Sequence, residues 1–214
     1  MTWLYITLTL VGSYLIGGIP FGLIAGKMKG KDIRHEGSGN IGATNAGRVL
    51  GRIWFFAVFA MDAGKGLLCT WIGYMLMDQA GCDLPLIAAA GVLAGHFYSP
   101  YLNMQGGKGV ATGFGIIFIL TIPPWTWVPG PALCAVGVFI VLLVFTRMVS
   151  AASMGASAAV PGLYAIWLGE AISHPPNFGR LIVLSVIAVF IVARHAGNIK
   201  RMLQGTEARI GAKP

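Results

Sequence analysis

Charge is scarce in this sequence, because Asp, Glu, Lys and Arg together make up only 10% of its 214 residues. Soluble globular domains carry about 25% charged residues, so the composition argues against a water-soluble globule. Cysteine is also rare: Cys69, Cys82 and Cys134 are scattered without C-x-x-C spacing, and two of them lie in apolar stretches. Neither a metal site nor a disulfide framework is therefore indicated.

Two glycine-rich segments lack the context that nucleotide binding requires. Residues 37–42 read G-x-G-x-x-G, but no predicted strand precedes them, which excludes a dinucleotide-binding βαβ unit. Residues 106–109 read G-G-K-G, yet Leu102 stands where a Walker A loop needs Gly, and Gly109 stands where it needs Ser or Thr. ATP binding by that route is excluded. Lys108 on a glycine-rich turn that opens a helix remains a good phosphate contact.

Apolar segments fill most of the chain, in which 56% of the residues are hydrophobic and the mean hydropathy is +0.76. The first segment, Thr2 to Gly26, carries no charge and is long enough to cross ~30 Å of hydrocarbon. It lacks the basic start of a signal peptide, and its positive charges follow it, so we expect it to be retained. The six further apolar segments are 53–77, 84–101, 109–123, 131–146, 148–169 and 178–195.

The sequence therefore predicts an all-α polytopic membrane protein: a compact bundle of seven transmembrane helices that forms a single integral-membrane domain over residues 1–214. Pro123-Pro124 and Pro129-Gly130-Pro131 separate the fourth span from the fifth. Six spans are the alternative, because only 13 uncharged residues lie between Arg180 and Arg194 in the last segment.

Positive charge is distributed unevenly over the loops of such a chain. One side collects thirteen of the fifteen lysines and arginines, whereas the other side has only Arg180, and Lys65 lies inside the second span. By the positive-inside rule, the N-terminus is outside and the C-terminus is cytoplasmic. With Asp32, Glu36 and Glu207 subtracted, the cytoplasmic face carries about +10. The thirteen residues are Lys27, Lys29, Lys31, Arg34, Arg48, Arg52, Lys108, Arg147, Arg194, Lys200, Arg201, Arg209 and Lys213.

Membrane topology alone demands positive inner loops, so the uncharged polar residues are the better guide to function. The most informative segment is residues 37–45, G-S-G-N-I-G-A-T-N, a polar loop between two apolar segments and flanked by basic residues. Its backbone is free of bulky side chains, which suits it to hold an anion at the start of a helix. A phosphate-binding site at a membrane surface is the first inference.

Further polar clusters lie at the other predicted cytoplasmic span ends, and in a small bundle these ends should lie near one another. His96 and His195 end two spans beside glycines, where an imidazole can act as a base, a phosphate donor or an interface anchor. Asp62 and Lys65 are three residues apart in the second span, so they share a helix face. We expect them to form a structural ion pair, with indirect support of the site as the alternative.

Three motifs together resemble the bacterial membrane acylphosphate:glycerol-3-phosphate acyltransferase family. They are G-S-G-N-I-G-A-T-N (37–45), G-H-F-Y-S-P-Y (95–101) with G-G-K-G-V-A-T (106–112), and H-A-G-N-I-K-R-M-L-Q-G-T-E (195–207). Their order and spacing fit over nearly the whole chain. The resemblance implies transfer of a fatty acyl group from acyl phosphate to glycerol 3-phosphate, which gives lysophosphatidic acid and phosphate in the first acylation of phospholipid synthesis.

The resemblance also implies seven spans, an outward N-terminus and a bacterial inner-membrane location with the active site facing the cytoplasm. The implied partners are acyl phosphate, glycerol 3-phosphate and the lipid bilayer. Neither nucleic acid, a cofactor, a metal, acyl-CoA nor acyl carrier protein is implied.

Site roles follow from the resemblance at the matching positions. The implied catalytic residues are Ser38, Lys108, His195 and Asn198. The implied substrate-binding residues are Ser38, Asn40, Thr44, Asn45, Arg48, His96, Gly106, Gly107, Lys108, Thr146 and Glu207. A hydroxyl at the turn between the fifth and sixth spans belongs to the family site, for which Thr146 is the first match and Ser150 the second. Ala196-Gly197 departs from relatives that are often polar there, which leaves His195 and Asn198 unaffected.

The expected chemistry needs no strong nucleophile, because acyl phosphate is an activated anhydride with a good leaving group. No Ser-His-Asp set is apparent, and an H-x-x-x-x-D pattern fails because Tyr101 follows His96 by five residues. We expect direct attack by the glycerol hydroxyl, with Arg48, Lys108 and loop amides holding the phosphates and stabilising the oxyanion. Candidates for removing the proton are His195, Asn198 as an orienting group, and a substrate phosphate.

Two other functions compete with this interpretation. A membrane transporter or channel for an organic phosphate is the alternative from another class, but such proteins tend to show repeated halves and polar groups at mid-membrane. No internal repeat is visible here. A lipid-linked sugar-phosphate transferase generally needs clustered acids for Mg²⁺, and the acids of the inner loops are few and dispersed.

Overall fold

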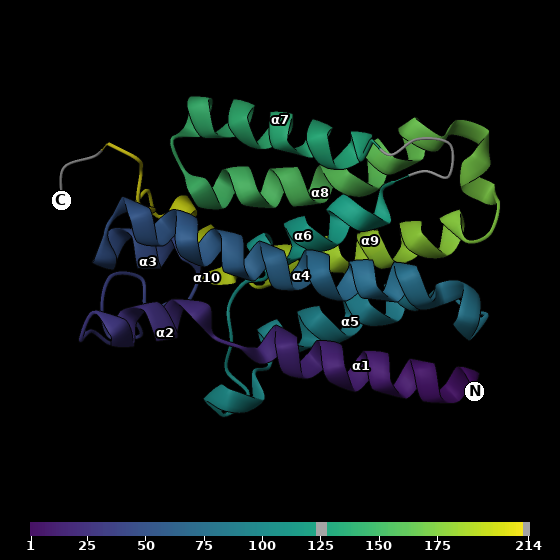
Figure 1. Ribbon diagram of the computed structural model, residues 1–214. Coiled ribbons are helices and arrows are strands. Elements are labelled where there is room, and N and C mark those ends of the chain that lie inside the picture. Colours follow the sequence, from purple (N-terminus) through teal and green to yellow (C-terminus); the bar gives the residue numbers. More distant parts are fainter. Residues whose placement is uncertain (123–127, 212–214) are drawn as a thin grey trace. The chain divides into compact units, whose positions relative to one another are not determined.

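The computed structural model describes residues 1–122 and 128–211, and these residues contain helices and no strand (Figure 1). The predicted break at Pro123-Pro124 and the predicted cytoplasmic charge of Lys213 lie outside the described residues. The helices are α1 (Thr2–Gly18), α2 (Phe21–Met28), α3 (Ala43–Leu50), α4 (Arg52–Ala80), α5 (Leu84–Phe97), α6 (Val110–Leu120), α7 (Gly130–Thr146), α8 (Val149–Leu168), α9 (Asn177–Ala193) and α10 (Ala196–Leu203). Two short 3₁₀ helices follow α5 and α8, at Pro100–Leu102 and Gly169–Ser173.

Each of the seven predicted apolar segments contains an α-helix, which confirms the all-helical class. In the described residues, three segments are long and apolar enough to cross a membrane by themselves: Thr2–Met28, Arg52–Ala80 and Val149–Ser173. A fourth is obtained if α9 and α10, which meet at a bend of 53°, count as one span. Helix α6 has 11 residues and α7 has 17, fewer than the roughly 20 that a perpendicular crossing needs.

The first predicted span is interrupted, which the charge pattern did not indicate. Helix α1 ends at Gly18, and α2 begins at Phe21. Pro20 lies between them and has no N–H to continue the hydrogen-bond ladder. The carbonyl oxygens of Gly18 and Ile19 instead accept hydrogen bonds from Ser99 Oγ at 2.6 Å and Lys65 Nζ at 3.1 Å. Side-chain donors from elsewhere in the chain thus satisfy the broken ladder.

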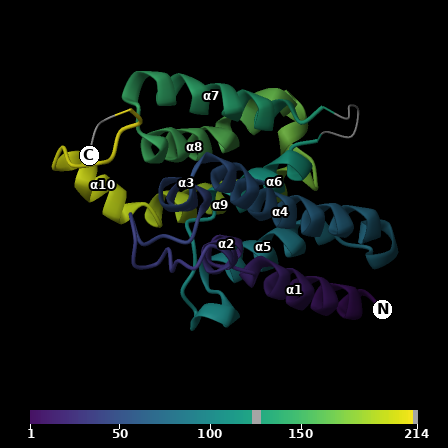
Figure 2. The same cartoon turned by 60° about the vertical axis from the view of Figure 1, so that its left-hand side comes forward.

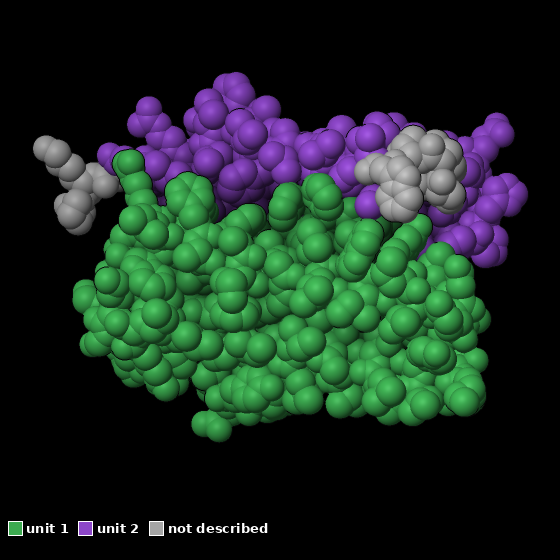
Figure 3. Space-filling view, in the orientation of Figure 1, with its two compact units in different colours: residues 1–120 green, residues 121–214 purple. Residues whose placement is uncertain are grey.

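The chain divides into two compact units, residues 1–120 and 121–214, which are coloured separately in Figure 3. In the first unit, α1 packs along α5, and α4 contacts α3, α5 and α6 (Figure 1 and Figure 2). Gly91 and Gly95 of α5 face the backbone of α1, where a Cβ would run into the carbonyl oxygens of Leu10 and Tyr14. Small residues at this spacing allow the two helices to approach closely, as is typical of helix contacts in membrane proteins.

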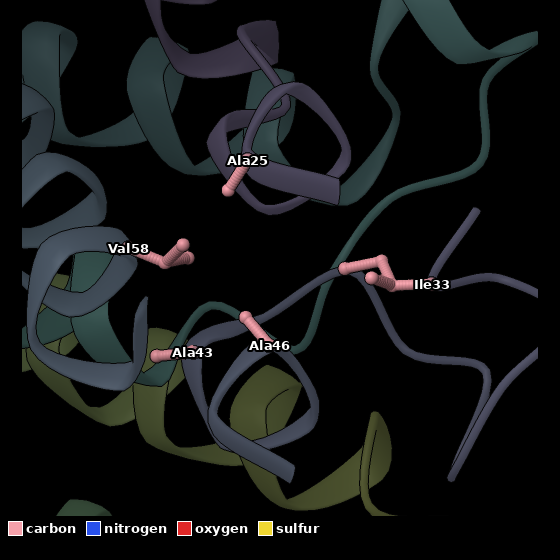
Figure 4. Packing of buried hydrophobic residues seen from close by; sticks show 5 residues of the cluster. All are labelled: Ala25, Ile33, Ala43, Ala46 and Val58. Carbon is pink, nitrogen blue, oxygen red and sulfur yellow. The ribbon is translucent and has the colours of Figure 1, made fainter. Parts of the chain in front are cut away.

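A small apolar cluster fixes the first glycine-rich segment in this unit. Ile33, in the loop after α2, is fully buried and packs with Ala25, Ala43, Ala46 and Val58 (Figure 4). These partners come from α2, α3 and α4. The loop between α2 and α3 is therefore anchored at its start by one apolar side chain, which leaves the glycines that follow at the surface.

The second unit contains α7 to α10. Helix α8 packs against α7 on one side and α9 on the other. The backbone N–H of Ile210 donates to the carbonyl of Arg147 at 2.7 Å, which ties the segment after α10 to the turn between α7 and α8. Three separate parts of the sequence, the α7–α8 turn, α10 and residues 205–210, are brought together in this way.

Candidate active site

Asn45 organises the loop that the sequence singled out. Its side chain is 2% exposed, and its Nδ2 donates to the carbonyls of Ile33 at 2.9 Å and Glu36 at 3.1 Å. Its Oδ1 accepts from the backbone N–H of Ser38 at 2.8 Å. Gly37 has φ +62°, and a Cβ there would collide with Asn45 Oδ1. The Asn45 amide, which is predicted to contact substrate, holds three points of the loop backbone.

The same loop opens a helix, as the sequence predicted. Gly42 is the N-cap of α3, and Asn40 Oδ1 accepts from the Gly42 N–H at 2.9 Å. Thr44 and Arg48 lie on α3 with exposed side chains, and the Arg48 side chain passes beside Gly37. The positive end of a helix dipole and an exposed guanidinium are thus close to the loop, which favours an anion.

His96 lies beneath the second glycine-rich segment and explains why two glycines stand there. The Gly107 N–H donates to the His96 carbonyl at 3.1 Å. A Cβ on Gly106 would collide with that carbonyl, and one on Gly107 would collide with the imidazole Nε2. The imidazole is 5% exposed, and its Nδ1 lies 3.2 Å from Thr112 Oγ1. Lys108 follows, half-buried, at the turn before α6.

The two glycine-rich loops meet at one surface pocket of about 390 Å³ in the first unit. Asn40 and Gly106, both predicted site residues, line it together. The remaining lining residues are Arg34, His35, Gly39, Ile41, Leu102 and Gln105. The pocket therefore combines exposed backbone of two loops with a guanidinium, an imidazole and two amides, which are groups that bind phosphate.

An acidic side chain moderates the charge at the edge of this pocket. Arg34 makes a two-pronged contact with Asp32, with Nη2–Oδ2 at 2.6 Å and Nε–Oδ1 at 2.9 Å. The hydrogen bonds from Arg34 hold the pKa of the Asp32 carboxyl well below its ordinary value, and Asp32 in turn raises the pKa of Arg34. Arg34 stays charged at every physiological pH, but the Asp32 carboxylate partly offsets its positive charge.

In the second unit, Glu207 collects three donors. Its Oε1 accepts from Ser150 Oγ at 2.6 Å and from Asn198 Nδ2 at 2.7 Å, and its Oε2 accepts from Arg201 Nε at 2.8 Å. Burial raises the pKa of the Glu207 carboxyl, but the hydrogen bonds from Ser150, Asn198 and Arg201 outweigh burial, so the pKa lies below its ordinary value. Glu207 is therefore an ionised carboxylate at neutral pH.

His195 is held at the start of α10, three residues before Asn198. It is 3% exposed, and its Nδ1 lies 2.7 Å from the carbonyl oxygen of Ile191. A carbonyl only accepts, so Nδ1 carries a proton, and in the neutral ring Nε2 is the basic nitrogen. This tautomer suits a ring that accepts a hydrogen bond or a proton through Nε2.

The α7–α8 turn separates the two hydroxyl candidates. Thr146 Oγ1 donates to the Leu142 carbonyl at 2.7 Å and accepts from the Met148 N–H at 3.1 Å. It therefore forms hydrogen bonds with backbone groups at the C-terminal end of α7. Ser150 is buried and bonds to Glu207. The structure thus brings the second match, Ser150, into the polar cluster with Asn198 and Glu207, whereas Thr146 bonds to local backbone.

Sequence reasoning did not assign a site role to Arg34, His35 or Gln105, which line the pocket, or to Arg201, which bonds to Glu207. For two of them, the position in the sequence could have indicated a site role. Gln105 directly precedes the G-G-K-G segment, and Arg201 follows Asn198 by three residues on one helix face. That Arg34 and the second loop line the same pocket depends on tertiary packing and leaves no trace in the sequence.

Apolar helices that carry these polar groups at their ends define the chain as an all-helical membrane protein. The family model described as glycerol-3-phosphate acyltransferase matches residues 7–205. Among curated relatives, the glycerol-3-phosphate acyltransferase of Thermosynechococcus vestitus is 40% identical over 211 residues, with 94% of this chain and 92% of the relative covered. That of Desulfotalea psychrophila is 38% identical over 197 residues, with 91% and 93% covered.

Solved structures of the same family also match this chain. Crystal structures of PlsY, an integral membrane glycerol 3-phosphate acyltransferase, match this chain at 33% identity. The TM-score is 0.82 for the glycerol 3-phosphate form, with 96% of each chain covered. It is 0.79 for the lysophosphatidic acid form, with 96% of this chain and 95% of that chain covered. This chain belongs to the glycerol-3-phosphate acyltransferase family.

Proposed function

We propose that this protein transfers a fatty acyl group from acyl phosphate to a hydroxyl of glycerol 3-phosphate and releases lysophosphatidic acid and phosphate. The observation that carries the proposal is the pocket where two glycine-rich loops meet, in a chain that the family model matches over residues 7–205. The related PlsY structures in glycerol 3-phosphate and lysophosphatidic acid forms support this acceptor and product. Family membership favours the acyltransferase over the transporter alternative.

The proposed step is a direct substitution at the acyl carbon. The glycerol hydroxyl oxygen forms a bond to the acyl carbonyl carbon, and the bond from that carbon to the phosphate oxygen breaks. The hydroxyl proton passes through a basic group to the departing phosphate, which leaves as the inorganic phosphate dianion. No covalent enzyme intermediate is needed, because the mixed anhydride already supplies a good leaving group.

The first unit is proposed to hold phosphate. Arg48 and Lys108 supply positive charge, and Ser38, Asn40 and Thr44 supply polar contacts beside the loop amides. Asn45, His96, Gly106 and Gly107 keep the two loops in shape through the contacts described above. Preorganised donors of this kind lose little energy when the charge on the oxyanion develops.

The second unit is proposed to orient the attacking hydroxyl. The hydrogen bond from Asn198 Nδ2 to Glu207 fixes the amide, so that Oδ1 is its accepting end. His195 is the candidate protein base, through Nε2, and a substrate phosphate is the alternative. Near-normal turnover in a His195→Ala variant would remove the histidine base and leave the substrate-assisted route.

We also propose seven spans, an outward N-terminus and a cytoplasmic active site in the bacterial inner membrane, with both units forming one acyltransferase domain over residues 1–214. The excess of Lys and Arg on one side and a helix in each predicted segment support this topology. Single cysteines at positions 40, 108 and 198 should all be labelled from the cytoplasmic side. Labelling of any one of them from the outside alone would contradict the topology.

The reaction is tested with purified protein, glycerol 3-phosphate and either acyl phosphate or acyl-CoA, without added divalent metal. We expect lysophosphatidic acid and an equal amount of phosphate from acyl phosphate, and no product from acyl-CoA. A Lys108→Ala variant should lose turnover or show a higher KM for a phosphate substrate. Product from acyl-CoA alone would overturn the proposed donor.

A further inference from the structure

A buried ion pair in α4 has no role in the proposed reaction. Asp62 and Lys65 are 3% and 4% exposed, and Lys65 Nζ lies 2.8 Å from Asp62 Oδ1, which confirms the predicted pair. Charged groups inside a membrane segment are costly, so they are rare and tend to mark functional positions. Each partner of this pair also makes a second contact outside α4, and the two contacts lead toward different glycine-rich loops.

Lys65 reaches the break in the first span. Its Nζ donates to the Ile19 carbonyl at 3.1 Å and lies 5.6 Å from the centre of the Phe21 ring. Ile19 is the C-cap of α1, and Phe21 is the first residue of α2. One ammonium group therefore contacts both sides of the interruption at Pro20 and fixes where α2 begins.

Helix α2 packs directly against the first loop. Gly22, one residue after Phe21, lies so close to the loop that a Cβ would collide with the Ile41 carbonyl oxygen. Gly26, one turn later, faces the carbonyl of Lys31 in the same way. Ile41 itself lines the pocket. A shift of α2 would therefore move one wall of the pocket directly.

Asp62 reaches the second loop through His96. Its Oδ1 lies 3.8 Å from His96 Nδ1. The His96 carbonyl accepts the Gly107 N–H, and its imidazole fills the space beside Gly107. Gly106 lines the pocket opposite the first loop. A shift of the His96 ring would therefore move the other wall.

We propose that Asp62 and Lys65 are positioning residues that set the separation of the two glycine-rich loops around the pocket. This inference rests on the proposed function, since it concerns affinity for the phosphorylated acceptor. A pair that only stabilises the bundle would lower the amount of active enzyme and leave its KM unchanged. If the pair sets the separation of the two loops, its removal raises the KM for glycerol 3-phosphate in the molecules that remain folded.

The test compares Lys65→Met and Asp62→Asn with wild type, after each protein has been purified as a folded species in detergent. We expect the KM for glycerol 3-phosphate to rise at least about tenfold in Lys65→Met, with kcat within about threefold of wild type. Lys65→Arg keeps a charged donor and should restore KM to within about threefold. Thr70→Val is the matched control, because Thr70 is fully buried in α4 and its hydroxyl donates to the Gly66 carbonyl of its own helix.

Hydrogen–deuterium exchange supplies a readout that needs no turnover. In Lys65→Met, amides of residues 33–42 and 104–109 should exchange faster together, while those of α8 stay as in wild type. If Lys65→Met does not accumulate, Asp62→Glu takes its place, because one extra methylene displaces the carboxylate against His96. We expect its KM to rise about threefold and the second loop to exchange faster.

An unchanged KM in the folded variants, or faster exchange spread equally over the first unit, would overturn the positioning role. Failure of the wild type to acylate glycerol 3-phosphate would overturn the proposed function instead. The exchange experiment would then still show whether the pair holds the two loops, so the two failures are distinguishable.

Discussion

The two units present polar groups that are built in different ways. In the first unit, two glycine-rich loops line the pocket, and the buried residues Asn45 and His96 hold the backbone of these loops through hydrogen bonds. In the second unit, side chains bond to one another around a single carboxylate, Glu207. Gly37, Gly106 and Gly107 leave no room for a Cβ, whereas the cluster around Glu207 depends on charge. We therefore expect the first unit to be sensitive to added side-chain atoms and the second unit to be sensitive to loss of charge.

The largest effect is expected when a methyl group is added to a glycine-rich loop of the first unit. Gly107→Ala would place a Cβ against the His96 imidazole, so the second loop must shift. We expect kcat/KM to fall about 100-fold, which corresponds to about 2.7 kcal/mol of lost transition-state stabilisation. The control is Gly64→Ala, where a Cβ meets nothing within 4 Å. Equal activity of the two variants would show that the loop does not depend on close packing.

A smaller effect is expected when the support of the first loop is removed. Asn45→Ala leaves the carbonyls of Ile33 and Glu36 and the N–H of Ser38 without their partner. We expect a loss of about 1–3 kcal/mol in unfolding free energy and a fall of about 30-fold in kcat/KM, checked by thermal unfolding and kinetics. Gln204→Ala, at an exposed position, serves as control. Wild-type stability in Asn45→Ala would argue against this support.

A third effect is expected when the negative charge at the centre of the second unit's cluster is removed. Glu207→Gln keeps the shape of the side chain but weakens the bonds from Ser150 and Arg201, and we expect kcat to fall about tenfold, or ~1.4 kcal/mol. The sign of the pH dependence follows from the lowered pKa of Glu207. Its stabilisation is present above the ordinary pKa of 4.5 and is lost as pH falls through the lower folded-state value.

Thermal midpoints measured across acidic pH check this sign. The advantage of wild type over Glu207→Gln should be constant near neutral pH and shrink below about pH 4. An advantage that grows with acidification would mean that Glu207 is protonated in the folded protein, which contradicts the charge-centred cluster.

The smallest effect should distinguish the two hydroxyls at the α7–α8 turn. Ser150 donates to Glu207, whereas Thr146 bonds to the backbone of Leu142 and Met148. Ser150→Ala should lower kcat/KM about threefold to tenfold and Thr146→Val by less, since a hydrogen bond to an ionised carboxylate is stronger than a neutral one. The reverse order in initial rates would favour Thr146 as the hydroxyl of the site.

Much of this arrangement is readable from the sequence where local chemistry decides the structure. The glycine-rich segments predict the starts of α3 and α6, because backbone without bulky side chains precedes an apolar or amphipathic helix in both places. The spacing of Asp62 and Lys65 predicts their pairing, since residues three apart share a helix face. These predictions use only the period of a helix and the properties of glycine.

Other features depend on contacts between distant residues. Pro20 permits a break in the first span, and Lys65, 46 positions later, donates a hydrogen bond to the Ile19 carbonyl at this break. Ser150 rather than Thr146 meets Glu207 because the segment after α10 returns to the α7–α8 turn. Arg34 lines the same pocket as Gln105 and Gly106, and its neighbour Ile33 is packed in the apolar cluster with Ala46 and Val58. No sequence period encodes such contacts.

The contrast between the proposed phosphate pocket of the first unit and the carboxylate-centred cluster of the second is tested most directly by calorimetric titration of glycerol 3-phosphate. Wild type, Gly107→Ala and Glu207→Gln would be compared in the same detergent. We expect Kd to rise at least about tenfold in Gly107→Ala and to stay within about threefold of wild type in Glu207→Gln. Wild-type affinity in Gly107→Ala, together with lost affinity in Glu207→Gln, would contradict this contrast.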